Sequence, residues 1–186
     1  MMLTAKRLFS FLLPLLLSGC FGNSDISRPW KKTIRSELTY LGARNWVVVA
    51  EAAFPVQSRR GIRVIYIDAE IPDLVDGIEQ VIEEKHHVKP RIYVTAEISK
   101  VEYDYAPGVK YYRKELESAL HGREALALNN SMLMRMLRDT SKTYRLLIIK
   151  SRTALPYSSV FMELGSGYWD EESESHLRDM MEKKEM

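Results

Sequence analysis

Short apolar runs separated by amphipathic stretches divide most of the chain. Trp46–Ala50 reads WVVVA, a continuous and mostly β-branched run of the length expected for a strand that is buried on both faces. Similar runs recur along the chain, and the predicted strands are Trp46–Ala50, Arg63–Ile67, Arg91–Ile98, Arg145–Lys150 and Ser159–Leu164.

Helical patterns lie between these runs. Pro72 fits the first turn of a helix, and apolar residues follow it at helical spacing, namely Leu74, Val75, Ile78, Val81 and Ile82. Gly108–His121 and Ser131–Lys142 are further predicted helices, the second with Ser131 as its N-cap. Strands that alternate with helices predict an α/β fold, a single layered domain with a mostly parallel central sheet and flanking helices.

Composition and charge exclude several classes of protein. The chain has 186 residues, of which 46% are hydrophobic and 28% charged, which excludes a disordered, collagen-like or multi-span membrane protein. The formal net charge is +2, so charge gives no reason to expect nucleic acid as a partner. The single cysteine excludes an internal disulfide and any multi-cysteine metal site. We predict no metal and no cofactor.

The first twenty residues have the pattern of a targeting segment. A basic start at Lys6 and Arg7 precedes the apolar run Leu8–Leu17, which is too short to span a bilayer and is typical of a signal peptide over residues 1–19. Leu17–Cys20 (LSGC) resembles the bacterial lipobox, in which the cysteine is lipidated and becomes the first residue of the mature chain. The alternative is a chance cysteine beside an ordinary cleavage site.

These features predict a protein of the bacterial cell envelope, held at a membrane by lipidated Cys20. Phe21, rather than an acidic residue, follows the cysteine and favours the outer membrane, with the protein facing the periplasm. We divide the remainder into a tether to residue 36, a domain over residues 37–168 and a charged tail over residues 169–186, which is a solvated helix or a frayed end.

Candidate chemistry is sparse along the chain. There is no glycine-rich phosphate loop, no His-x-x-x-His pair and no Gly-x-Ser-x-Gly elbow. Three of the four histidines (His86, His87 and His121) fall at predicted helix ends, where they complement the helix dipole, and the fourth (His176) lies in the tail.

Glu51 follows a predicted buried strand, where ligands bind in open α/β sheets; the alternative is a solvated loop acid. Tyr157 and Ser159 enter another strand with a phenol and a hydroxyl.

Both stretches resemble the RbsD/FucU family, the D-ribose pyranases and L-fucose mutarotases. The family's first motif is Gly-His-Gly-Asp, five residues, then Asp-Ala-x-Phe-Pro; the matching stretches here are Gly42–Asn45 and Glu51–Pro55. Its C-terminal Tyr-x-Asn is matched by Tyr157 and Ser159, and a closing glycine by Gly165. The resemblance spans residues 37–166 and implies the RbsD-like form of the α/β fold.

Weaker matches and departures accompany these motifs. Asp68 falls where fucose-type members carry an aspartate, Glu97 matches the family's Ala-x-Glu, and Tyr112-Arg113 resembles a fucose-type helix. In the first motif, Ala43 replaces the family histidine, Asn45 replaces the aspartate that follows it, and Glu51 replaces the later aspartate. Ser159 replaces the asparagine of the C-terminal motif. Arg44 adds a cation, and the second histidine of ribose-type members has no counterpart.

The resemblance implies interconversion of ring forms or anomers of a free monosaccharide such as ribose or fucose. Glu51 and Tyr157, with Asp68 nearby, would transfer protons, while Arg44, Ser159 and Glu97 would bind sugar hydroxyls. It also implies a homo-oligomer.

Two other functions remain open: a binding module that holds a sugar without turning it over, and an envelope scaffold without a ligand. In the binding module, four tyrosines would either stack on the sugar or pack in the fold, namely Tyr103, Tyr105, Tyr111 and Tyr112.

Overall fold

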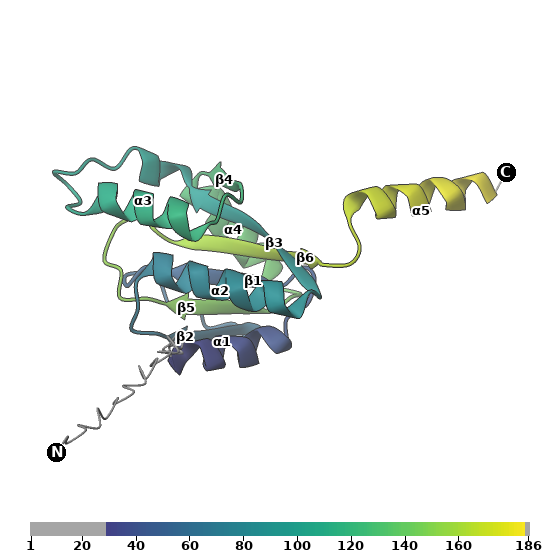
Figure 1. Cartoon of the computed structure of the whole chain (residues 1–186), viewed down its shortest axis with the longest axis horizontal. Coiled ribbons are helices and arrows are strands. Elements are labelled where there is room, and N and C mark those ends of the chain that lie inside the picture. The colour runs from purple at the N-terminus through teal and green to yellow at the C-terminus, as the bar shows by residue number, and fades with distance from the viewer. Residues whose placement is uncertain (1–28, 185–186) are drawn as a thin grey trace, which may run out of the picture.

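Six strands form one mixed sheet in the order β2-β5-β1-β6-β3-β4 (Figure 1). The computed structural model describes residues 29–184. In chain order the elements are α1 (Pro29–Thr39), β1 (Trp46–Ala50), β2 (Ile62–Tyr66), α2 (Ile71–Lys85), β3 (Val88–Thr95), the 3-10 helix η1 (Ala96–Ser99), α3 (Val109–Ala119), β4 (Ala125–Leu128), α4 (Asn130–Thr140), β5 (Leu146–Lys150), β6 (Val160–Ser166) and α5 (Glu171–Lys184).

All described strands except β6 run in the same direction. Strand β5 is parallel to β1 and β2, and β3 is parallel to β4, while β6 lies antiparallel between β1 and β3. This arrangement confirms the predicted α/β class and its mostly parallel sheet.

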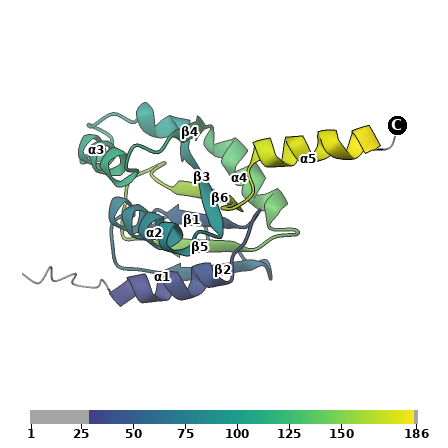
Figure 2. The same cartoon turned by 45° about the vertical axis from the view of Figure 1, so that its right-hand side comes forward.

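Both faces of the sheet are covered, which explains the continuous apolar run in β1. Val47 and Val49 pack beneath α1, α2 and α3, whereas Trp46 and Val48 belong to a second cluster that includes Leu133 of α4. Figure 2 shows α1, α2 and α3 on one side of the sheet and α4 on the other. A strand between two layers has no polar face, so no alternation is visible in its sequence.

One helix and one strand lie where the sequence predicted no regular structure. Strand β4 has only four residues, ALAL, which is too short for a pattern to show. Helix α1 includes residues 29–36, which the sequence analysis assigns to the tether, and its Ile34 and Leu38 are fully buried. Trp30 of α1 lies so close to Gly77 of α2 that a Cβ on the glycine would stand 2.5 Å from the indole.

Strand β3 differs from the prediction at both ends. It begins at Val88 and ends at Thr95, and the residues after it, predicted as strand to Ile98, form η1 instead. Pro90 is tolerated inside β3 because pairing with β4 starts only at Ile92, which leaves the missing N–H of the proline on an open side. Helix α4 starts at Asn130, with Asn129 rather than Ser131 in the N-cap position.

The tail forms α5, which projects away from the rest of the described chain (Figures 1 and 2). An ion pair of 2.6 Å between Arg91 and Glu171 connects its first turn to β3. Within residues 29–184 no helix combines the length and the apolar character that crossing a bilayer requires. The predicted signal peptide and Cys20 lie outside the described residues.

Candidate functional site

Five of the six residues predicted for the sugar site lie at one edge of the sheet. Parallel strands end at the same edge, and β6 begins there because it runs in the opposite direction. We call this the carboxyl edge; the predicted residues that lie there are Glu51 after β1, Asp68 after β2, Glu97 after β3, and Tyr157 and Ser159 before β6. In open α/β sheets this is the edge at which ligands bind.

Glu51 is the group best suited to proton transfer. Its side chain is half-buried, and its Oε2 is buried without a hydrogen-bond partner among the described residues. Burial raises the pKa of the Glu51 carboxyl; its own backbone amide, that of Ser159 and the charge of Lys150 act in the opposite direction. A carboxyl with a raised pKa exchanges protons closer to neutral pH than a solvated one.

Ser159 lies directly beside Glu51. The backbone N–H of Glu51 donates to Oγ of Ser159 at 3.1 Å, across a gap of 108 positions in the sequence. Ser159 is buried, so this hydroxyl supports Glu51 from within the fold. The structure thus brings together the two motifs on which the predicted site depends.

Tyr157 presents its phenol at the same edge. Its side chain is 41% exposed, and its backbone has a left-handed φ of 60°. Its carbonyl accepts a hydrogen bond of 2.5 Å from Oγ1 of Thr95, the last residue of β3.

Tyr112, which the sequence analysis named as one of four tyrosines that would stack on a sugar or pack in the fold, is buried beside Glu51. Burial and the charge of Glu51 raise the pKa of the Tyr112 phenol, and its hydroxyl donates to the carbonyl of Ser158. Its position in α3 between buried Val109 and Leu116, at spacings of three and four residues, is the signal that could have placed it inward. Tyr103, Tyr105 and Tyr111 are exposed.

Asp68 lies at the carboxyl edge but in a separate group of charges. Its side chain is exposed, and an oxygen lies 3.8 Å from Arg152, which also donates to Glu70 at 2.9 Å. The hydroxyl of Tyr66 lies 3.5 Å from the Asp68 carboxylate. Arg152, in the loop after β5, was not singled out in the sequence because its neighbourhood depends on the order of the strands.

Glu97 has a structural partner. Both oxygens of its carboxylate accept from the backbone N–H of Asn130 at 3.0 Å, so Glu97 caps the amino end of α4. A carboxylate at this position also complements the helix dipole.

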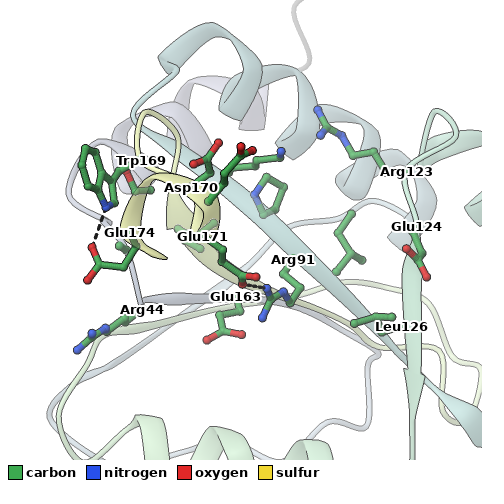
Figure 3. Close-up of a pocket in the computed structure, with 18 residues that line it drawn as sticks. Arg44, Arg91, Arg123, Glu124, Leu126, Glu163, Trp169, Asp170, Glu171 and Glu174 are labelled. Atoms are coloured by element: carbon green, nitrogen blue, oxygen red, sulfur yellow. Dashed lines mark hydrogen bonds and ion pairs between the residues drawn. The ribbon is translucent and has the colours of Figure 1, made fainter. Parts of the chain in front are cut away.

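Arg44 lies at the other edge of the sheet, because it precedes β1 whereas Glu51 follows it. A strand of this length separates the two by on the order of 20 Å. Arg44 donates to the hydroxyl of Tyr144 at 2.9 Å and lines a cavity of about 1000 Å³ beside Arg91, Trp169 and Glu171 (Figure 3). Glu51, Asp68 and Tyr157 do not line this cavity.

Histidine, cysteine and carboxylate side chains are the usual protein ligands of metal ions. Within residues 29–184 no group of three or more His, Cys, Asp or Glu side chains is arranged to hold a metal ion. His86 adopts a left-handed conformation at the end of α2, and His121 pairs with Asp76 at 2.8 Å.

Comparisons with known proteins gave matches among solved structures. No protein-family model and no curated protein matches the chain. RbsD of Bacillus subtilis in complex with D-ribose is 20% identical, with 72% of this chain and 91% of that chain covered and a TM-score of 0.48. The fucose mutarotase of Streptococcus pneumoniae in complex with L-fucose is 21% identical, with 70% and 89% covered and a TM-score of 0.47.

FucU of Bifidobacterium longum is 15% identical, with 72% of this chain and 92% of that chain covered and a TM-score of 0.48. These three solved structures are an RbsD protein, a fucose mutarotase and a FucU protein.

Proposed function

We propose that this protein accelerates the interconversion of ring forms or anomers of a free monosaccharide, with Glu51 as the group that moves the proton. The observation that carries the proposal is the half-buried Glu51 carboxyl at the carboxyl edge, with a raised pKa and one oxygen that has no hydrogen-bond partner among the described residues. The same residue occupies the carboxylate position of the sugar-isomerising motif that the sequence resembles.

The chemistry needs two proton transfers and no redox step. Glu51 takes the proton of the anomeric hydroxyl while the bond between the anomeric carbon and the ring oxygen breaks, and the ring oxygen receives a proton. The open-chain aldehyde then closes on either face of its carbonyl. General acid–base help of this kind contributes about 10²–10⁴-fold. Tyr157, with an exposed phenol, is the proposed donor to the ring oxygen, and Asp68 is a proposed hydroxyl ligand.

Exchange spectroscopy tests the proposal directly. NMR saturation transfer between anomers of D-ribose, L-fucose and D-galactose measures how fast each form converts with and without the purified protein. We expect faster exchange in proportion to protein concentration for at least one sugar, and its loss in Glu51→Gln. The matched control is Glu102→Gln, since Glu102 is an exposed carboxylate in the segment after η1. Unchanged exchange in Glu51→Gln overturns the role of Glu51.

A sugar-binding protein without catalysis is the second candidate. Exposed phenols at Tyr66 and Tyr157 share the carboxyl edge with the charges of Asp68 and Arg152. Aromatic faces and charged groups of this kind bind sugars without any proton transfer. Sugar binding that broadens the NMR signals of the sugar and leaves its exchange rate unchanged would favour this candidate.

Lipid anchoring is proposed on the sequence of residues 17–20, with the outer membrane as the site. Helix α1 leads through residues 40–45 to the start of β1, so its first residue, Pro29, lies toward the carboxyl edge, whereas α5 leaves the fold on the opposite side (Figure 1). The chain between Cys20 and Pro29 reaches at most about 30 Å. An anchored protein would therefore hold its carboxyl edge near the membrane.

Fractionation of cells tests the anchor. Cys20→Ser should abolish labelling by a radioactive fatty acid and move the protein from the membrane to the soluble fraction. A wild-type protein that is soluble and unlabelled would contradict the anchor.

Sedimentation of the purified chain tests the homo-oligomer that the family resemblance implies, and a monomer at all concentrations would contradict it.

A further inference from the structure

Tyr157 has an unusual backbone conformation for a large side chain. Its φ of 60° lies in the left-handed region, where the Cβ of a non-glycine residue crowds the backbone. Such a conformation persists where the surroundings hold it, and strained residues of this kind often cluster at functional sites. The conformation places a 41% exposed phenol at the carboxyl edge.

Three side-chain hydroxyls hold the loop that contains Tyr157. Thr95 donates to the carbonyl of Tyr157 at 2.5 Å, Tyr112 donates to the carbonyl of Ser158, and Ser158 donates to the carbonyl of Leu155 at 2.7 Å. We call these three hydroxyls the loop clamp. All three donors are buried, where a hydroxyl without a partner would be costly, so each bond is strongly favoured.

The loop clamp connects two other elements to the candidate site. Thr95 comes from the end of β3 and Tyr112 from α3, whereas on the other side of the loop Ser159 accepts from the backbone of Glu51. Two of the three clamped carbonyls, those of Tyr157 and Ser158, belong to the residues directly before Ser159, whose hydroxyl contacts Glu51.

We propose that Thr95 and Tyr112 are positioning residues for the sugar site: their hydroxyls hold the Tyr157–Ser159 segment so that the Tyr157 phenol and Ser159 are oriented relative to Glu51. The inference rests on the proposed function and adds to it, because neither residue needs to touch the sugar. Reacting groups must be held to within a fraction of an ångström, and a displacement of 1 Å can cost about 100-fold in rate.

Isosteric substitutions test the loop clamp. Thr95→Val and Tyr112→Phe each remove one hydroxyl and preserve most of the packing. We expect the exchange rate at saturating sugar to fall about 10-fold to 100-fold in each, with little change in the sugar concentration that gives half-saturation. Thr95→Ser keeps a hydroxyl at this position, unlike Thr95→Val, and should keep the exchange rate near that of the wild-type protein.

The matched control is Ser141→Ala. Ser141 is also a buried hydroxyl that donates to a carbonyl, that of Arg138 at 2.8 Å, but it follows α4 and precedes β5 at the opposite edge of the sheet. Its loss should lower the melting temperature without lowering the saturated exchange rate. This comparison separates positioning from a general loss of stability.

The outcomes distinguish failure of the clamp from failure of the function. Suppose that the wild-type protein accelerates exchange and a clamp variant behaves like Ser141→Ala. This result overturns the positioning role and leaves the proposed function in place. A loss of rate in Thr95→Ser as large as that in Thr95→Val also overturns the positioning role. A wild-type protein that accelerates no sugar overturns the proposed function and the positioning role together. If Thr95→Val does not fold, Tyr112→Phe decides the question by the same measurements.

Discussion

The backbone N–H of Glu51 and the hydroxyl of Ser159 form a hydrogen bond of 3.1 Å between the end of β1 and the start of β6. The two strands are neighbours because Val49 pairs with Val160 in antiparallel register. This single contact joins the two sequence motifs of the candidate site. It also orients the backbone from which the half-buried carboxyl projects.

Ser159→Ala should weaken the site by removing this acceptor. The Glu51 amide would lose its partner, which costs about 1–3 kcal/mol where the group is buried. We expect a lower free energy of unfolding in urea, a shifted amide resonance for Glu51 and slower sugar exchange. Ser99→Ala is the control, because Ser99 is exposed and donates to Ala96 at 2.8 Å. An unchanged Glu51 resonance in Ser159→Ala would contradict the contact.

Two cations are expected to differ in their influence on Glu51. The positive charge of Lys150 lowers the pKa of the Glu51 carboxyl against the effect of burial. Lys150→Met should therefore raise this pKa further and move the acid limb of the exchange-rate profile to higher pH. Arg44→Met removes a cation at the opposite edge and should leave the limb in place. NMR titration of the Glu51 carboxyl carbon measures both, and equal shifts would argue against the assigned edges.

Glu51→Gln should stabilise the protein at neutral pH. Because burial raises the pKa of Glu51 in the folded state, the folded chain keeps this proton to a higher pH than the unfolded chain. The contribution of Glu51 to the free energy of unfolding therefore falls as pH rises from about 4.3, the ordinary value, through the folded pKa. Above that range the buried charge is a cost, which glutamine does not carry.

The expected gain at pH 7 is about 1 kcal/mol or less, a rise of about 2–4 °C in Tm. The gain should shrink as pH falls toward 4, where the wild-type carboxyl is protonated. Thermal unfolding at pH 4 and pH 7 measures it, with Glu102→Gln as the exposed control. A variant less stable than wild type at pH 7 would refute this prediction.

Gly77→Ala should weaken the attachment of α1. The added Cβ would stand 2.5 Å from the Trp30 ring, and overpacking of this kind costs about 1–3 kcal/mol. Trp30→Ala in the same chain removes the clash, so the double variant should lose less than the sum of the two single losses. Additive losses by urea unfolding would show that α1 does not pack on α2 at this position.

The amino-acid sequence determined the parts of this protein that depend on local pattern. Strand β1 and helix α2 were predicted because burial on both faces needs a continuous apolar run and burial on one face needs helical spacing. Glu51 was placed at a strand end for the same reason. Strand β4 was missed because four residues are too few to show a pattern. Helix α1 was missed because most of its residues are polar, although Trp30, Ile34 and Leu38 recur at helical spacing.

Tertiary structure alone decided which side chains meet. Arg44 and Glu51 are seven positions apart but lie at opposite edges, because β1 separates them, whereas Ser159 reaches Glu51 from 108 positions away. Glu97 became a helix cap because η1 ends beside the start of α4. The order and direction of the strands depend on the packing of the whole chain. They bring Lys150 and Tyr112 beside Glu51, and so set the pKa of Glu51 and the conformation of Tyr157.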